Sequence, residues 1–257
     1  MIEPIPVPAL SDNYVWLVKQ PADTAVAIVD PGEAAPVLQA IDEGGYEPVA
    51  ILITHHHKDH VGGLAEVRER FPELPVYGPA GENVAGVTQR VGGGDTIEIP
   101  RLDTRFDVID TPGHTLGHIS LHGGGVLLCG DTLFAGGCGR VFEGTHEQMA
   151  ASLARLAGLP GDTLCCCGHE YTLKNLEFAR AVEPDNAALA EREQGAKATR
   201  QMGNPTVPFS LAPEFETNPF LRCDAPNVHA AAERHAGRSL GDAVEVFGVL
   251  REWKNNF

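Results

Sequence analysis

Five potential metal ligands lie within six consecutive positions of the stretch ILITHHHKDHVGG, residues 51–63. They are His55, His56, His57, Asp59 and His60, and they follow directly on a strand-like apolar run. Imidazole nitrogens and carboxylate oxygens together suit zinc, iron or manganese, and a packed interior would not tolerate them unpaired. A catalytic metal commonly takes three protein ligands and keeps a position open. Five candidates exceed the needs of one such site, so the cluster predicts two cations.

The backbone spacing divides these residues into two groups. In an extended chain alternate side chains share a face, so His55 and His57 are expected to point the same way, with His56 opposed. Asp59 and His60 lie just past the bend, at the start of a predicted helix, and are expected to form a second group.

Three more candidate ligands follow strand-like runs later in the chain. His114 comes after VIDTPG, Asp131 after VLLCG and His169 after LCCCG. Each stands just past a strand and a glycine, so we expect one edge of the folded sheets to bring them together. A carboxylate such as Asp131 can bridge two cations because it has two oxygens.

Two such cations would lower the pKa of a water held between them and stabilise the oxygen that becomes negative in a tetrahedral intermediate. The predicted chemistry is therefore hydrolysis at a carbonyl or phosphoryl centre. A purely structural metal site would need further ligands to close its open positions, and the sequence offers no evident candidates.

The elements that must position these ligands are short strands and helices up to about residue 172, and mostly helices after it. Strands are expected at 13–20, 25–32, 49–54, 96–99, 105–113, 118–124, 125–131 and 163–170, and helices at 35–44, 59–71, 145–160, 174–184, 186–201 and 240–255. The helix at 145–160 can begin at Thr145, with Gln148 three residues on. This order predicts the α+β class, with a mixed domain at residues 1–171 and a small helical domain at residues 172–257.

The composition limits the partners. The chain carries 19 Lys and Arg against 35 Asp and Glu, a net charge of −16, which argues against nucleic acid as a partner. No stretch approaches the roughly 20 apolar residues of a membrane span, and no secretory signal is evident, so a cytoplasmic monomer is expected. The run Cys165–Cys167 contains no C-x-x-C pair, and its members are expected to be small buried apolar residues.

The motif T-H-H-H-K-D-H, together with the later His114, Asp131 and His169, resembles that of the metallo-β-lactamase fold superfamily, T-H-x-H-x-D-H. The resemblance implies an αβ/βα four-layer sandwich and two divalent metal ions per chain, zinc with iron or manganese as alternatives. It implies that His55, His57 and His114 bind the first metal and that Asp59, His60 and His169 bind the second. By the same resemblance Asp131 bridges the two, Asp59 helps to orient the attacking hydroxide, and His56 is not a ligand.

Four further stretches, DTLFAGGCGRVFEGT, GHEYTLKNLEFA, NPFLR and VFGVLREWKNNF, resemble the hydroxyacylglutathione hydrolases, or glyoxalase II enzymes. This resemblance covers essentially the whole chain. It implies hydrolysis of S-(2-hydroxyacyl)glutathione thioesters, typically S-D-lactoylglutathione to D-lactate and glutathione, a step in methylglyoxal detoxification. The residues that match the glutathione site of this family are Arg140, Phe142, Tyr171, Arg251 and Lys254. Many family members have a lysine where this chain has Arg140 and a tyrosine where it has Phe142.

The residues of the tail are compatible with that role and with another. Arg251 and Lys254 are three apart and share a face of a predicted helix, while the stripe Val244, Phe247 and Leu250 can pack on the main domain. An ordinary solvated helix end would look the same by spacing alone. A glutathione persulfide dioxygenase or a lactonase of the same superfamily is the alternative activity. His118 is expected to orient its neighbours or to be structural.

Overall fold

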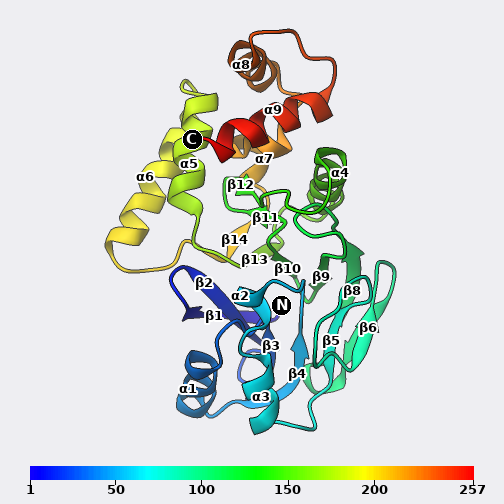
Figure 1. Cartoon of the computed structure of the whole chain (residues 1–257). Helices are drawn as coiled ribbons and strands as arrows, with labels where there is room; N and C mark the ends of the chain where they lie inside the picture. Colours follow the sequence, from blue (N-terminus) through cyan, green and yellow to red (C-terminus); the bar gives the residue numbers. More distant parts are fainter.

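The structure is a computed structural model that describes all 257 residues, and two six-stranded sheets organise it (Figure 1). Sheet A has the order β1 (Glu3–Ala9), β2 (Asn13–Lys19), β3 (Ala25–Val29), β4 (Glu47–Leu52), β5 (Val76–Pro79) and β6 (Gln89–Val91). Sheet B has the order β14 (Phe209–Ser210), β13 (Leu164–Cys167), β10 (Val126–Gly130), β9 (Ile119–Gly123), β8 (Thr104–Asp110) and β7 (Thr96–Ile99). A small hairpin, β11 (Leu133–Phe134) and β12 (Gly137–Cys138), follows β10.

Alternation along the strands of sheet A explains why this sheet is covered on both faces. In β2, Trp16 and Val18 belong to the large apolar cluster that also contains the inner residues of sheet B. Val15 and Leu17, which point to the other face, belong to a second cluster formed with α1 (Ala34–Gly44) and α3 (Leu64–Arg70). Every residue of β2 is buried, as expected for a strand between two apolar layers.

The outer layer on sheet B is helix α4 (His146–Ala157), whose Met149, Leu153 and Leu156 join the large cluster. The helix begins with the predicted capping box: the Gln148 backbone N–H donates to Thr145 Oγ1, and the Thr145 N–H donates to the Gln148 side chain. The layers therefore run helix, sheet, sheet, helix, and the predicted α+β four-layer architecture is confirmed.

The C-terminal part consists mainly of helices, gathered at the top of Figure 1. They are α5 (Thr172–Val182), α6 (Ala187–Gln201), α7 (Glu214–Thr217), α8 (Pro226–Ala236) and α9 (Ala243–Asn255), with a 3-10 turn at Pro219–Leu221. The short strand β14 interrupts them and pairs with β13 of sheet B. Two residues leave no alternating pattern in a sequence, so this link between the tail and sheet B was not predicted. No helix has the length and apolar character that a bilayer span requires.

The helix predicted at 59–71 is two helices, α2 (Lys58–Val61) and α3, separated by Gly62 and Gly63. A Cβ atom on Gly63 would lie 2.4 Å from the backbone nitrogen of Ala34. The chain after β3 packs too closely here for a side chain, so the prediction of one continuous helix was wrong for a tertiary reason.

All six cysteines are buried and unpaired, which confirms the prediction for the run Cys165–Cys167. Burial raises the pKa of each of these three thiols, so they remain protonated and unreactive.

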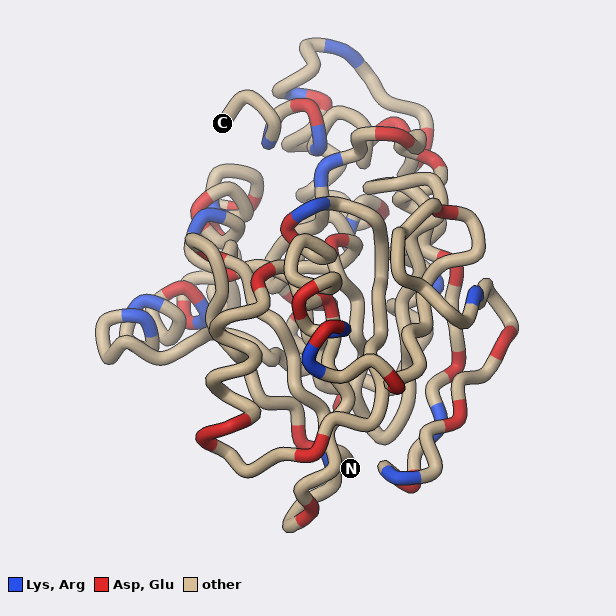
Figure 2. The backbone as a smooth tube through the Cα atoms, turned by 60° about the horizontal axis from the view of Figure 1, so that its bottom comes forward, with Lys and Arg blue, Asp and Glu red and all other residues tan.

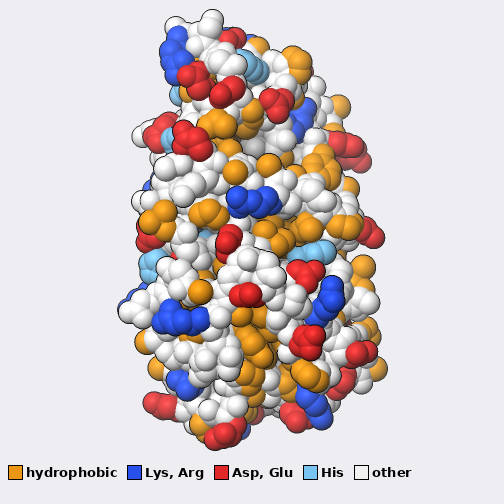
Figure 3. Space-filling view, turned by 90° about the vertical axis from the view of Figure 1, so that its right-hand side faces the viewer, with side chains coloured by type: hydrophobic (Ala, Val, Ile, Leu, Met, Phe, Trp, Pro, Cys, Tyr) orange, Lys and Arg blue, Asp and Glu red, His pale blue; other side chains and the backbone are white.

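Acidic and basic residues are both spread along the chain (Figure 2) and are interspersed over the molecular face of Figure 3, without a large area of one sign. The face drawn in Figure 3 therefore lacks the extended basic surface that nucleic-acid binding requires.

Candidate metal centre

The seven predicted ligands meet at one edge of the two sheets, beyond the ends of four strands. The motif loop follows β4, and α2 carries Asp59 and His60. His114 follows β8, Asp131 follows β10, and His169 follows β13. Because β10 and β13 are parallel neighbours with Gly130 opposite Cys167, their two ligands leave the sheet side by side. The structure therefore confirms that these residues come together at one edge of the sheets.

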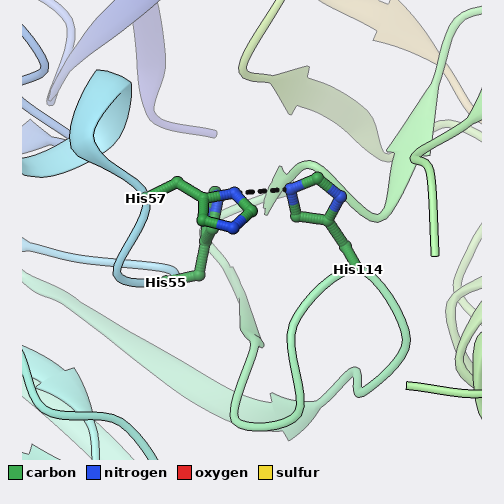
Figure 4. Close-up of side chains that lie close together, drawn as sticks. All are labelled: His55, His57 and His114. Atoms are coloured by element: carbon green, nitrogen blue, oxygen red, sulfur yellow. Dashed lines mark hydrogen bonds between the residues drawn. The ribbon is translucent and has the colours of Figure 1, made fainter. Parts of the chain in front are cut away.

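The first ligand group contains His55, His57 and His114. One ring nitrogen of each lies within 4.8 Å of the others. His57 Nδ1 and His114 Nε2 point toward each other and lie 2.9 Å apart (Figure 4). His114 Nδ1 donates to the carbonyl oxygen of Arg140 at 2.8 Å, so its Nε2 keeps a lone pair that points at the centre.

The second ligand group contains Asp59, His60 and His169, whose ligand atoms also lie within 4.8 Å of one another. Asp131 stands between the groups. Its Oδ2 is 3.4 Å from His114 Nε2 and 3.2 Å from His169 Nε2, and its Oδ1 is 3.4 Å from His60 Nε2. Asp131 is thus the one carboxylate of the cluster that contacts nitrogens from both groups.

Two carboxylates that the sequence analysis missed orient the second group. Asp30 Oδ2 accepts from His60 Nδ1 at 3.0 Å, and Asp12 Oδ1 accepts from His169 Nδ1 at 2.9 Å. These bonds fix the ring orientation and leave each Nε2 free for a cation, as the partners of metal-bound histidines do. Asp30 follows β3 as directly as the ligands follow their strands, and this signal could have revealed it. Asp12 lies in a loop and has no such signal.

His118 is fully buried beside the centre and is not one of the ligands. Its ring stacks on that of His55, with centroids 4.8 Å apart, and its Nε2 accepts the backbone N–H of Asp131 at 3.2 Å. His118 therefore orients the backbone of Asp131, in line with the orienting role expected for it.

Three buried polar atoms of the cluster make no hydrogen bond within the protein: His55 Nε2, His60 Nε2 and Asp131 Oδ1. A buried polar atom without a partner costs free energy, and a bound cation would supply the partner for all three. Imidazole and carboxylate donors are also the set that zinc, iron and manganese accept. The residues therefore fit divalent cations, and the chain has a metal-binding site here.

The charges of the two groups differ. Burial lowers the pKa of His55, His57 and His114, so the first group is neutral and has the lone pairs that a cation needs.

In the second group the carboxylates dominate. Burial acts to lower the pKa of His169, but the charge of Asp131 and the hydrogen bonds to Asp131 and Asp59 together outweigh it and raise this pKa to about 10. Burial acts to raise the pKa of Asp131, yet His60 and His169 hold it well below its usual range. The hydrogen bond with His169 lowers the pKa of Asp59. The two aspartates therefore stay ionised and attract positive charge, which a metal ion can supply in place of protons.

The centre opens into a cavity of about 710 Å³, and all five residues predicted to bind substrate line it. Tyr171 stacks on His169 with centroids 4.6 Å apart. Phe142 is 61% exposed, and its edge faces His57 and His114. The structure thus places both aromatic residues against metal ligands.

Four Lys and Arg residues line the cavity, and the three that were predicted to bind substrate have different surroundings. Arg251 is only 3% exposed, and its guanidinium donates to the carbonyl oxygens of Cys138 and Gly139. Lys254 bonds to Asn175, and burial, with the nearby charge of Arg251, lowers its pKa to about 7. Arg140 donates to the carbonyl oxygen of Asn255 at 3.3 Å and is the exposed member.

The burial of Arg251 excludes the alternative that the end of α9 is an ordinary solvated helix end. Phe247 and Leu250 are buried as predicted, but Val246 takes the core position expected for Val244, which is half-buried. The apolar stripe is rotated because Arg251 also packs inward, with its guanidinium 5.1 Å from the Phe220 ring centroid.

Comparison with known proteins agrees with this geometry. Residues 10–169 match the family model of the metallo-beta-lactamase superfamily, and residues 170–257 match the model of the hydroxyacylglutathione hydrolase C-terminus. The chain is 51% identical to the hydroxyacylglutathione hydrolase of Nitrosomonas eutropha over all of both chains. It is 54% identical to that of Xylella fastidiosa strain M12, over 98% of this chain and 96% of the relative.

Solved structures show the same fold. The B3 metallo-beta-lactamase BLEG-1 superposes with a TM-score of 0.63 at 24% identity, over 86% of this chain and 99% of the other. The protein TTHA1623, in a di-iron-bound form, superposes with a TM-score of 0.53 at 28% identity, over 65% of this chain and 91% of the other. With a metal centre at the sheet edge and full-length relatives at this level of identity, the chain belongs to the hydroxyacylglutathione hydrolase family, within the metallo-beta-lactamase superfamily.

Proposed function

We propose that this enzyme hydrolyses S-(2-hydroxyacyl)glutathione thioesters, typically S-D-lactoylglutathione, to the hydroxy acid and glutathione. The observation that carries the proposal is a single cavity lined by five of the seven predicted metal ligands and by basic residues of the C-terminal helices. The other two predicted ligands, His55 and His60, are buried behind this surface. A thioester with an anionic peptide end fits both features. The names of the full-length relatives support the same substrate class.

In this proposal the first ligand group would hold one divalent cation and the second group would hold another, with Asp131 as a ligand shared by the two groups. Bound there, the cations supply Lewis acidity, which lowers the pKa of a shared water and polarises the thioester carbonyl. Zinc suits the donor set, with iron and manganese as alternatives. The di-iron form of the similar TTHA1623 supports the iron alternative.

The protein side chains orient the reactants. Asn13 Nδ2 donates to Asp59 Oδ2 at 3.0 Å, which fixes the carboxylate at the mouth of the centre. Because Asp59 stays ionised, this oxygen can accept a hydrogen bond from the attacking water. The leaving group needs no dedicated acid, since a thiol with a pKa of about 8.5 departs as a thiolate.

Recognition of the glutathione end falls to the cavity wall. Glutathione carries two carboxylates, which Arg140 and Lys254 can pair at neutral pH. Arg251 acts mainly through the loop that it holds, because its donors are engaged with Cys138 and Gly139. Phe142 and Tyr171 form aromatic walls beside the reacting thioester.

We also propose two domains, a hydrolase domain at residues 1–171 that holds the metal centre and a helical substrate-binding domain at residues 172–257. The cavity wall is shared, because Arg140, Phe142 and Tyr171 come from the first domain and Arg251 and Lys254 from the second. A cytoplasmic monomer accords with the sequence features discussed above.

The test is to follow thiol release from S-D-lactoylglutathione, with and without a chelator. A matched thioester that lacks the glutamyl and glycyl ends serves as the control substrate. We expect chelator-sensitive hydrolysis with a strong preference for the glutathione thioester. Equal rates on both thioesters would contradict glutathione recognition. Oxygen consumption with glutathione persulfide, in the absence of thioesterase activity, would favour the dioxygenase alternative.

A further inference from the structure

His56, which is not one of the seven ligands, lies between two carboxylates at the rim of the metal centre. Its Nδ1 is 2.9 Å from Glu82 Oε2, and its Nε2 is 3.3 Å from Glu143 Oε1. The two nitrogens of an imidazole ring point in different directions, so His56 contacts Glu82 on one side and Glu143 on the other. His56 thereby links the two protein segments that carry these carboxylates.

Both carboxylates also bind the loop that carries His114. Thr115 Oγ1 donates to Glu82 Oε1, and the backbone N–H of Leu116 donates to Glu143 Oε2 at 3.0 Å. The side chain of Glu82 is only 3% exposed, and a Cβ atom on Gly117 would lie 2.4 Å from its Cγ. Burying a carboxylate costs free energy unless it is hydrogen-bonded, and Glu82 has such partners in both His56 and Thr115.

We propose that His56, Glu82 and Glu143 form a brace that positions His57 and His114 for the first cation, an inference that rests on the proposed metal assignment. His56 is the positioning residue. It is the chain neighbour of His57, and its two partners hold the residues that follow His114. The brace fixes both ligand loops before a cation arrives, so less ordering has to accompany metal binding.

The second ligand group does not depend on the brace. Asp12 orients His169, Asp30 orients His60, and Asn13 holds Asp59. Loss of the brace should therefore lower the affinity for one of the two ions and leave the affinity for the other unchanged. If the three residues served only the stability of the fold, both affinities should change alike.

The experiment measures metal affinity and requires no turnover. Apo-protein is titrated with Co²⁺ against a competing chelator, and the absorption of bound cobalt reports each ion. We expect His56→Ala to lower the affinity for one ion by about 10- to 100-fold, which is the usual effect of removing a partner of a metal ligand. The affinity for the other ion should stay within about threefold of the wild-type value. Asp12→Asn removes the carboxylate that orients His169 and should lower the affinity for the opposite ion, which assigns the two steps. His146→Ala, at a half-buried histidine on α4, is the matched control and should change neither.

Two further variants keep the test decisive if His56→Ala folds poorly. Glu143→Gln alters a partly exposed side chain and should weaken the same ion more mildly. His56→Gln keeps an amide donor for one carboxylate and should recover part of the affinity. Unchanged affinities in His56→Ala and Glu143→Gln, or equal weakening of both ions, would overturn the brace. A wild-type protein that binds two ions but hydrolyses no thioester would refute the proposed function and leave the brace intact.

Discussion

Lys254 allows a quantitative prediction, because its pKa lies close to neutral pH. Burial, with the charge of Arg251 beside it, lowers this pKa from 10.5 to about 7. Only the ammonium form can pair with a carboxylate of the substrate. Substrate binding should therefore be strongest below the pKa of the free enzyme and should weaken as the pH rises through it.

The magnitude follows from proton linkage. A free-enzyme pKa of about 7 leaves about 90% of the lysine protonated at pH 6 and about 10% at pH 8, so KM for S-D-lactoylglutathione should rise about tenfold between them. The rise continues until the pH reaches the higher pKa of the complex. Because the contact serves binding in the ground state and the transition state alike, kcat should change little for this reason.

The matched variants are Lys254→Arg and Lys254→Met, assayed by steady-state kinetics across this pH range. An arginine stays charged, so Lys254→Arg should flatten the pH profile of KM. Lys254→Met keeps most of the packing over Phe178 and loses the charge, so its KM should be high and insensitive to pH. For the lost charged hydrogen bond we expect about 1.5–3 kcal/mol, or roughly 10- to 100-fold in KM. A wild-type KM that is flat from pH 6 to 8, or the same slope in Lys254→Arg, would refute the reasoning.

Three further outcomes are expected. Asp131→Ala should remove most of the activity and most of the bound metal together, as elemental analysis beside the thiol-release assay would show; near wild-type turnover would contradict the bridging position. Asp30→Asn removes the carboxylate that orients His60 and should lower the affinity for one metal ion by about 10- to 100-fold in chelator competition. Arg192→Ala leaves the buried Glu214 without its ion-pair partner and should lower the free energy of unfolding in urea by about 3–5 kcal/mol, whereas Glu214→Gln, which removes the buried charge, should cost less.

The sequence predicted the clustering of the candidate metal ligands better than the residues that support them, because the two depend on different information. Each ligand stands just after a strand, and the ends of neighbouring strands must meet at one sheet edge. The partners of those ligands are set by tertiary contact. Asp12 meets His169 across 157 positions of the chain. Glu82 and Thr115 meet only because two loops pack together.

The same distinction explains the errors in the fold. Strand β1, EPIPVPA, was missed because proline disfavours strands. Here the prolines alternate along an edge strand, where their missing N–H groups are tolerated. Helix α9 was expected to expose Arg251, since spacing alone cannot show that backbone carbonyls would receive a buried guanidinium.

The C-terminal helices support the metal centre as well as the substrate, because they hold the loop at residues 131–140. This loop begins with Asp131 and ends with Arg140, whose carbonyl oxygen accepts from His114 Nδ1. Side chains of the tail form hydrogen bonds with its backbone groups, and these are Asn175, Glu214, Asn218 and Arg251. The tail thereby fixes the backbone between Asp131, which contacts both ligand groups, and Arg140, which orients His114. A change in the tail that releases this loop would move predicted metal ligands and the substrate cavity together, so we expect such a change to weaken binding of the cations and of the substrate at the same time.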